Sequence, residues 1–321
     1  MTSLKGLSSM NNIKFIIDSY PYNDYRNYPL LKEEQKRQAM YLKVLSCLGQ
    51  GGEALTETYK GEVGIIILRE LPWDSSFFNI PMASIDGMFL REGADETLRK
   101  RLLDIALDWM KKKRIKHISF KVDTADTKTV LALQKMGFYL VDTIVTHLYV
   151  KGYTITKKIK PLFKFRAFEE KDYNAVMDIV DYAFKGYKNR FTNDPYLPKD
   201  RMLSLYKGWV ENFIKREDGY LIVAERGGRV VGFLGYFCLK ELCEVTSRLH
   251  VGKALSAAGL KGMGCYPQFI SCLGNAPFYP DTVEGDASIN NTVVQKTWTK
   301  IGINGSAPLI KTKYVFHYWL K

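Results

Sequence analysis

The sequence predicts an α+β fold. Stretches with helical periodicity alternate with short apolar runs in both halves of the chain. A Gly-Gly pair separates two such runs in GYLIVAERGGRVVGFLGYFCLK, and both central residues of a tight hairpin need positive φ. The segments DTKTVLALQKMG and NTVVQKTWTKIG, 165 residues apart, share Thr, Lys and Gly at matching places. The two halves are therefore expected to repeat each other weakly.

Length and hydropathy set the class of protein. The chain has 321 residues, of which 46% are apolar, which suffices for a sizeable core and two domains of ordinary size. Its longest apolar runs fall far short of the roughly 20 residues needed to cross a bilayer. The opening MTSLKGLSSMNNIKF lacks an apolar core followed by a small-residue cleavage site. We expect no membrane span, no secretory signal and a cytoplasmic location.

Cysteine and histidine usage argues against a metal or disulfide framework. The cysteines are odd in number and lack paired CxxC spacing. The histidines are widely separated along the chain. We expect reduced thiols and no metal cofactor. The residues concerned are Cys47, Cys238, Cys243, Cys265 and Cys272, and His117, His147, His250 and His317.

The net charge of +13 is unevenly spread. Residues 1–150 carry 21 Lys and Arg against 18 Asp and Glu, and residues 151–321 carry 26 against 16, so the halves have net charges of +3 and +10. Such a surplus attracts phosphate-bearing ligands, whether nucleic acid, an anionic membrane or a phosphorylated small molecule. The sequence shows no nucleic-acid reader motif, so no nucleic-acid partner is expected.

The first half is expected to begin with an extension over residues 1–60 whose role the sequence does not reveal. It reads as a loop followed by a helix from about Leu31. Next come a strand at GIIILREL, then LPWDSSFFNIPMASIDGMFL as a turn leading into another strand. Apolar spacing predicts helices over 97–113 and 128–136, with the strand IKHISFKV between them. The basic stretch 151–164 lacks helical periodicity and separates domains over 61–152 and 163–321.

The second half is expected to run strand, helix (172–184), polar loop, helix (199–215), hairpin, strand around Leu255, glycine loop, a helical region, the strand DTVEGDAS and a helix from about Asn291. The second of these helices carries apolar residues at helical spacing, which indicates core packing. They are Met202, Leu205, Trp209, Val210 and Phe213.

This order of elements resembles a domain of the GNAT superfamily of N-acyltransferases. Within it, four segments resemble the TDP-fucosamine acetyltransferases in order and spacing: PWDSSFFNIPMASI, ALQKMGF, NRFTNDPYLPKDRMLSLYKGWVENFI and NTVVQKTWTKIG. The resemblance implies the GNAT fold, a mixed, mostly antiparallel twisted sheet flanked by helices, with residues 61–152 as a degenerate GNAT-like half. It implies transfer of an acetyl or other acyl group from acyl-CoA, as co-substrate, to the amine of a nucleotide-linked amino sugar.

The resemblance also implies where the coenzyme binds. Successive backbone N–H groups at a helix N-terminus cradle a pyrophosphate, and here the matching loop is GLKGMG, with Gly259 in place of the usual Gln or Arg. An ordinary glycine-rich turn is the alternative. The preceding strand would pair with the pantetheine arm and supply an oxyanion donor. The residues so implied are Leu255, Ala257, Lys261, Gly262, Met263 and Gly264, with Asn291 as an arm contact or a helix cap.

The proton donor is left open. Trp298 stands where family members usually carry a tyrosine that protonates the departing thiolate, and an indole N–H has no suitable pKa. Tyr314 and Tyr266 are the candidates that remain, unless solvent supplies the proton or the site is impaired. A thiol with a pKa near 8.5 needs little acid help to leave.

On the acceptor side, Arg190 and Asp194 lie in the polar loop and are the candidates for binding the substrate. Three further readings stay open: an enzyme that acylates an amino acid, a polyamine or a peptide amine; a catalytically impaired CoA-binding protein; and, with no motif in its favour, a nucleic-acid binder. The sequence does not indicate the oligomeric state.

Overall fold

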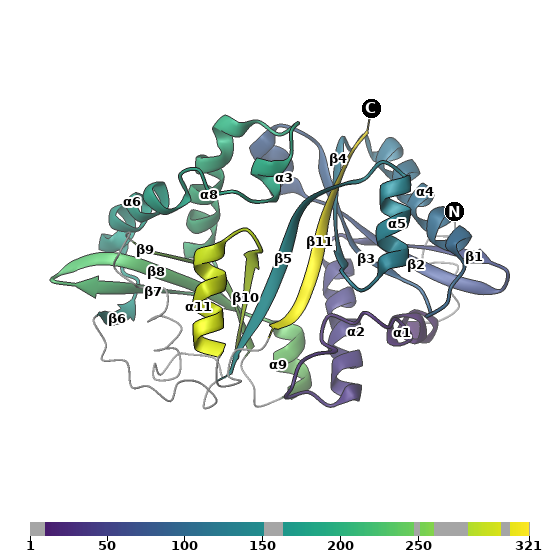
Figure 1. The fold of residues 1–321 in the computed structure, drawn as a ribbon, viewed down its shortest axis with the longest axis horizontal. Coiled ribbons are helices and arrows are strands. Elements are labelled where there is room, and N and C mark those ends of the chain that lie inside the picture. Colours follow the sequence, from purple (N-terminus) through teal and green to yellow (C-terminus); the bar gives the residue numbers. More distant parts are fainter. Residues whose placement is uncertain (1–9, 151–162, 247–250, 260–281, 303–308, 321) are drawn as a thin grey trace. The chain divides into compact units, whose positions relative to one another are not determined.

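The computed structural model describes residues 10–150, 163–246, 251–259, 282–302 and 309–320 (Figure 1). The helices are α1 (Met10–Asp18), α2 (Glu33–Gly49), α3 (Pro72–Phe78), α4 (Glu96–Lys113), α5 (Thr127–Lys135), α6 (Tyr173–Phe184), α7 (Arg190–Asn193), α8 (Met202–Ile214), α9 (Lys240–Thr246) and α11 (Thr292–Gly302). The strands are β1 (Glu53–Tyr59), β2 (Glu62–Glu70), β3 (Met82–Phe89), β4 (His117–Asp123), β5 (Tyr139–Val150), β6 (Lys164–Ala167), β7 (Gly219–Arg226), β8 (Arg229–Cys238), β9 (Val251–Gly259), β10 (Thr282–Ser288) and β11 (Leu309–Trp319).

The chain forms two compact units. Unit 1 contains residues 1–143 and 311–321, and unit 2 contains residues 144–310. The boundary expected between residues 152 and 163 falls on residues outside the described part of the chain. No helix in the described part is both long enough and apolar enough to cross a membrane.

The sheet of unit 1 has the strand order β1-β2-β3-β4-β11, in which only β3 and β4 are parallel. Ile66 and Leu68 of β2 belong to a core that α4 covers and to which Phe316 of β11 contributes. Because side chains alternate along a strand, Ile65 and Ile67 are buried on the opposite face. There α1 and α2 contact β2, so unit 1 has a helix layer on each face of its sheet.

Helices α4 and α5 of unit 1 begin and end within a residue or so of where the sequence predicts. Asp95 caps α4 by accepting a hydrogen bond from the Thr97 N–H, and Arg114 ends it in the left-handed conformation with φ 58°. Asp126 caps α5 in the same way, and Gly137 follows that helix with φ 86°. These two helices are therefore confirmed, and α2 (Glu33–Gly49) confirms the helix expected from about Leu31.

Three elements of unit 1 differ from the expectation. The segment PWDSSFF forms α3 and not a turn, because Pro72 suits a first helical turn and Ser75 Oγ bonds the Leu71 carbonyl at 2.7 Å. Asn79, with φ 55°, then ends the helix. Helix α1 and strand β1 are additional, and both contact β2. Much of the N-terminal 60 residues is thus part of the packed structure of unit 1.

The sheet of unit 2 has the strand order β5-β10-β9-β8-β7-β6, in which only β9 and β10 are parallel. The expected hairpin joins β7 to β8 through Gly227 and Gly228, with φ 58° and 74°. Helices α6 and α8 pack against β7 and β8 in a core around Val176, Tyr206 and Phe233. Of the apolar stripe predicted for α8, Met202, Leu205, Val210 and Phe213 are buried, as expected, and Trp209 is partly buried against the same core.

Each unit is completed by a strand from a distant part of the sequence. After α5 the chain enters β5, and from Ile144 onward β5 pairs with β10 inside unit 2. After α11 the chain returns as β11, which pairs with β4 inside unit 1. Neither unit has its full sheet without the other half of the sequence.

Candidate functional site

The pairing of β9 and β10 in unit 2 ends partway along both strands. Their parallel register runs from Thr282 opposite Val251 to Gly285 opposite Ala254, and both strands then continue unpaired with each other (Figure 1). On its other side β9 has a β-bulge at Leu255, which lies outside the register with β8. We call this point, where the bulge and the end of the pairing coincide, the β9–β10 fork.

A fork leaves backbone groups outside the sheet. Past the last β9–β10 pair, the carbonyl and N–H groups that β9 and β10 direct toward each other have no strand partner in the described part of the chain, although β9 still pairs with β8 and β10 with β5 on their other sides. A bulge also turns one residue out of register. These groups can bind an extended ligand by main-chain hydrogen bonds, as an added strand would. Leu255 and Ala257, both predicted to bind the coenzyme, lie on β9 at and beyond this point.

Unit 1 repeats this geometry. The parallel pairing of β3 and β4 ends at Ile85 opposite Phe120, and Asp86 is bulged out of the register with β2. The bulge of unit 1 is closed by the chain's own side chains. Asp86 accepts hydrogen bonds from Arg69, Cys47 and Ser84 at 2.5, 2.6 and 2.7 Å. The weak repeat in the sequence thus corresponds to a repeated backbone arrangement, but only in part to repeated side chains.

The polar residues at the start of α11 meet a tyrosine. Asn291 caps the helix, with its Oδ1 accepting a hydrogen bond from the Val294 N–H at 3.2 Å. Its Nδ2 donates to the hydroxyl of Tyr187 at 3.3 Å. Tyr187 follows α6 and packs its ring against Phe184 and Tyr206. A phenol hydroxyl is therefore held at the end of α11 that follows directly after β10.

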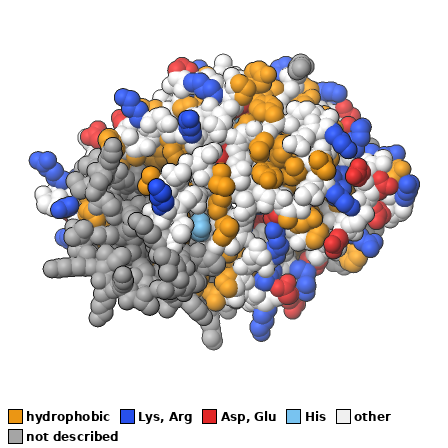
Figure 2. Space-filling model, viewed as in Figure 1, with side chains coloured by type: hydrophobic (Ala, Val, Ile, Leu, Met, Phe, Trp, Pro, Cys, Tyr) orange, Lys and Arg blue, Asp and Glu red, His pale blue; other side chains and the backbone are white. Residues whose placement is uncertain are grey.

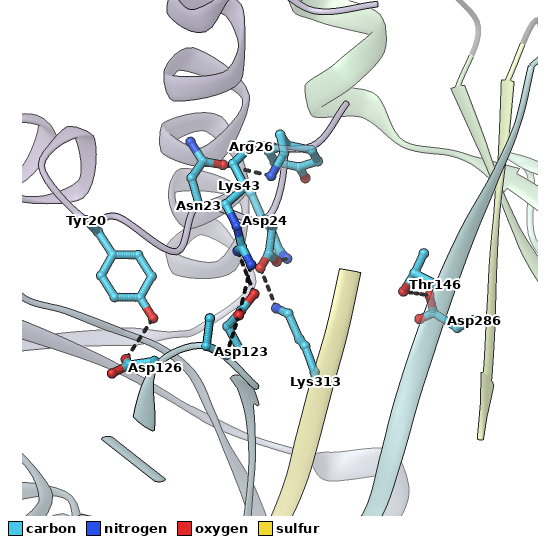
Figure 3. A network of polar contacts seen from close by, with 12 residues as sticks. Tyr20, Asn23, Asp24, Arg26, Lys43, Asp123, Asp126, Thr146, Asp286 and Lys313 are labelled. Carbon is cyan, nitrogen blue, oxygen red and sulfur yellow. Dashed lines mark hydrogen bonds and ion pairs between the residues drawn. The ribbon is translucent and has the colours of Figure 1, made fainter. Parts of the chain in front are cut away.

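The corresponding place in unit 1 has the same arrangement. Asp126 caps α5 and accepts a hydrogen bond from the hydroxyl of Tyr20 at 3.3 Å (Figure 3). Tyr20 follows α1 as Tyr187 follows α6, and its ring meets Phe89 edge-on. Burial, with the nearby Asp126 charge, raises the pKa of Tyr20 well above its usual value. This hydroxyl stays protonated at neutral pH.

Trp298 is a core residue of unit 2. It is 1% exposed and stacks on His147, with ring centroids 5.2 Å apart and planes 3° from parallel. The Nε2 of His147 lies 3.2 Å from Gln295 Oε1. The indole covers Gly285, where a Cβ atom would lie 2.6 Å from Trp298 Cζ2. The residue at the family's tyrosine position therefore fills space beneath the fork.

Two carboxylates lie on the opposite face of β10 from Trp298. Side chains alternate along a strand, so Glu284 and Asp286 point away from the face on which the indole covers Gly285. Through the register with β9 and β8, Glu284 shares a face with Phe233, which packs against α6 and α8. Asp286 accepts a hydrogen bond from Thr146 at 2.7 Å (Figure 3). It is also the first residue of β10 beyond the fork.

The acidic pair and Tyr187 have no counterpart among the predicted site residues. The signal for the acids was present in DTVEGDAS, where two carboxylates alternate with apolar residues in a short strand. Only the register places them beside the end of the β9 pairing. Tyr187 carries no local signal, because its partner lies 104 residues away in sequence.

The remaining predicted residues are spread over both units. Arg190 begins α7 with its guanidinium 4.4 Å from the centre of the Phe191 ring. Asp194 is fully buried and accepts the Tyr196 N–H at 2.9 Å. Tyr314 lies on β11 of unit 1, partly buried against that unit's core. The loop residues Lys261, Gly262, Met263 and Gly264, and Tyr266, lie outside the described part of the chain.

The α1 and α2 face of unit 1 has a buried ionic cluster. Arg26 forms a bidentate pair with Asp123 at 2.6 and 2.9 Å, and Asp24 pairs with both Lys43 and Lys313 (Figure 3). Burial alone would raise the pKa of Asp24, but the two ammonium groups outweigh it and hold that pKa well below its usual value. Both carboxylates are saturated by partners within unit 1.

Comparisons with known proteins place the fold. The sequence matches no family model, and no curated protein matches it. Among solved structures, it is similar to a GCN5-related N-acetyltransferase from Sphaerobacter thermophilus, with TM-score 0.56 and 13% identity over 96% of this chain and 91% of that one. A GCN5-related N-acetyltransferase from Kribbella flavida gives TM-score 0.50 and 9% identity over 87% and 95%.

A conserved protein of unknown function from Staphylococcus epidermidis gives TM-score 0.53 and 10% identity over 84% of this chain and 95% of that one. These identities are low, so the similarity concerns the fold. The alignments extend over most of the chain and so include both units. The chain has the GNAT fold, the α+β fold of the GCN5-related N-acetyltransferases, with a mostly antiparallel sheet flanked by helices.

Proposed function

We propose that unit 2 transfers an acyl group from acyl-CoA to a primary amine at the β9–β10 fork. The observation that carries the proposal is the coincidence of the Leu255 bulge with the last β9–β10 pair. It offers main-chain groups of β9 to an extended thioester arm and a bulged N–H to the carbonyl oxygen. Preorganised backbone donors of this kind stabilise the oxyanion of an acyl-transfer transition state. Acyl-CoA is the co-substrate that supplies the activated carbonyl.

Asp286 is proposed to hold the acceptor. An amine reaches the protein largely as an ammonium ion, and a carboxylate beside the fork both attracts it and takes its proton before attack. The nitrogen lone pair then adds to the thioester carbon and the carbon–sulfur bond breaks, while the nitrogen releases its second proton to solvent so that a neutral amide forms. Glu284, buried on the same face, adds to the negative potential there.

Tyr187 is proposed to protonate the thiolate that leaves. Its hydroxyl is held by Asn291 at the end of α11 near the tips of the fork. Trp298 cannot fill this role because its indole is enclosed in the core against His147. Tyr314 and Tyr266 stay predictions, as do Lys261 to Gly264 for the pyrophosphate. A thiolate has a low enough proton affinity that one weak acid suffices.

The acceptor is proposed to be the amine of a nucleotide-linked amino sugar. Three features support this: the resemblance to TDP-fucosamine acetyltransferases, the surplus of basic residues in the second half, and Arg190 at the start of α7. Arginine pairs well with phosphate oxygens. A polyamine, an amino acid or a peptide amine is the alternative acceptor, and a free polycation is disfavoured by the net charge of +13.

Release of free thiol from acetyl-CoA tests the proposal. The purified chain is incubated with acetyl-CoA and one amine at a time: a dTDP-linked 4-amino sugar, spermidine, an amino acid and a lysine peptide. We expect turnover with at least one amine, and with the amino sugar above the others. Binding of acetyl-CoA without turnover on any amine would identify a binding protein, and absence of both would refute the proposal.

Two single variants assign the roles. Asp286→Asn keeps an oxygen that can accept from Thr146 and is expected to lower kcat/KM for the amine by about a hundredfold, the usual scale for a general base. Tyr187→Phe is expected to lower kcat with little change in the KM of acetyl-CoA. Glu217→Gln, at an exposed acid between α8 and β7, is the matched control and should leave both constants unchanged.

A further inference from the structure

A cavity of about 310 Å³ lies between α4 and α5 in unit 1. Its volume is at the lower end of the roughly 300 to 1,000 Å³ of small-molecule sites. Three lysines line it, Lys100 from α4 and Lys128 and Lys135 from α5, together with apolar Leu131 and Met136. The combination of several ammonium groups with an apolar floor is suited to a ligand that has both an anionic and a planar apolar part.

The arrangement of these residues follows from helical spacing. Lys128, Leu131 and Lys135 stand at i, i+3 and i+7 on one stripe of α5. The two lysines are thus separated by about 10 Å along the axis, with the leucine between them. In Figure 2, orange and blue side chains lie next to each other over the region that α5 occupies in Figure 1.

The charge of the cavity is not neutralised from within. Lys100 pairs with Asp104 at 2.8 Å, and Glu96 is the acid that also lines the cavity. Within the described part of the chain, Lys128 and Lys135 form no ion pair. Leu131 is 52% exposed and adds accessible apolar surface beside the two charges.

We propose that this cavity binds a mononucleotide, with its phosphate held by Lys128 and Lys135 and its base on Leu131 and Met136. Lysine binds phosphate as a point charge and needs no fixed geometry. Thr97 and Glu96 supply a hydroxyl and a carboxylate at the rim for the hydroxyl and amino groups of a nucleoside. The inference concerns unit 1 alone and does not rest on acyl transfer in unit 2.

Photo-crosslinking of the full chain locates the ligand. With 8-azidoadenosine 5′-monophosphate, we expect label in the peptide that contains residues 127–136, and protection of that peptide by an excess of AMP. Label confined to peptides outside α4 and α5 would overturn the proposal. Competition by CoA but not by AMP would show that the cavity takes the nucleotide end of the coenzyme and not a free mononucleotide.

Affinity measurements on variants separate the two parts of the ligand. The Lys128→Ala/Lys135→Ala variant should weaken AMP binding by about tenfold or more, as expected for two lost charge contacts. The Lys111→Ala/Lys116→Ala variant removes two exposed lysines of unit 1 away from the cavity and should bind AMP normally. Equal loss in both variants would mean a general charge effect and refute the site.

Leu131→Ser tests the base contact. Because Leu131 is half exposed, its replacement should not disturb the core. We expect it to weaken AMP several-fold and to leave the affinity for inorganic phosphate unchanged. If inorganic phosphate bound as tightly as AMP to the unmodified chain, the cavity would be an anion site without a nucleoside preference, and the proposal would fail.

Discussion

Gly285 is the last β10 residue paired with β9, and Trp298 covers it from the α11 side. We predict that Gly285→Ala destabilises unit 2 by a clash with this one ring. The new Cβ would lie 2.6 Å from Cζ2 and 3.2 Å from Cε2 of Trp298. Ordinary carbon contacts begin near 3.4 Å, so the ring must move by roughly 0.8 Å.

The indole has little room for that movement. It is 1% exposed and stacks on His147, whose Nε2 lies at hydrogen-bond distance from Gln295. Overpacking of such a core costs about 1 to 3 kcal/mol. Trp298→Leu removes the obstacle, at a cost of about 2 to 4 kcal/mol for the cavity that it leaves. Leucine is chosen because Leu133 stands at the matching place of α5 in unit 1.

A double-mutant cycle isolates the clash. Urea unfolding of the unmodified chain, both single variants and the double variant is followed by far-ultraviolet circular dichroism. If the ring is the obstacle, Gly285→Ala should cost little in the Trp298→Leu background, with a coupling of about 1 to 2 kcal/mol. Additive effects, with a coupling below about 0.5 kcal/mol, would show that Trp298 does not lie against Gly285.

Other predictions concern unit 1. Lys313→Met removes one of the two ammonium groups that pair with Asp24 and should destabilise the chain by about 1 to 3 kcal/mol in urea unfolding, less than for a buried charge that loses every partner. The depressed pKa of Asp24 means that its contribution to stability is present above the unfolded-state value of about 3.9 and is lost as pH falls through the lower folded-state pKa, so the same variant should flatten the loss of stability below about pH 4. Burial, followed by the Asp86 charge, raises the pKa of Cys47 to about 12. Iodoacetamide at pH 8 should therefore alkylate Cys47 of the folded chain at least about a hundredfold more slowly than in urea, as followed by mass spectrometry. Similar rates in the two conditions would contradict the raised pKa. Deletion of residues 311–321 removes most of β11 and should abolish cooperative unfolding of unit 1, whereas an unchanged unfolding curve would mean that the strand is dispensable.

Local signals were enough for most elements. Asp95 and Asp126 cap the first turns of α4 and α5. Arg114 ends α4 in the left-handed conformation, and Gly137 follows α5. All four residues lie within two residues of the helix that they limit. The β7–β8 hairpin follows from Gly227 and Gly228 alone. Each of these features depends on residues close in sequence, which is why periodicity and turn chemistry predict them.

Elements stabilised by tertiary contacts were harder to predict. The segment of α3 contains two serines and three aromatic residues, which favour turns or strands as often as helices, and it is helical because Pro72 and Ser75 satisfy its first turn. Strand β1 has mixed polar composition and forms a strand by pairing along its length with β2. In both, context outweighs intrinsic preference.

The candidate site shows the same division. The repeat between the halves was visible in sequence, and it correctly indicated corresponding helices at Asp126 and Asn291. The exchange of β5 and β11 between the units was not visible in the sequence, because pairing between strands that are far apart in sequence leaves no local pattern. Nor could the acids of β10 be placed beside the fork without the register of three strands.

Hydrogen–deuterium exchange with and without acetyl-CoA tests the central claim most directly. If the fork of unit 2 holds the thioester arm, exchange of amides in residues 251–259 and 282–291 should slow when the coenzyme is added, while the matching strands of unit 1, residues 82–89 and 117–123, stay unchanged. Unchanged exchange at both β9 and β10, under conditions where acetyl-CoA is bound, would contradict the claim.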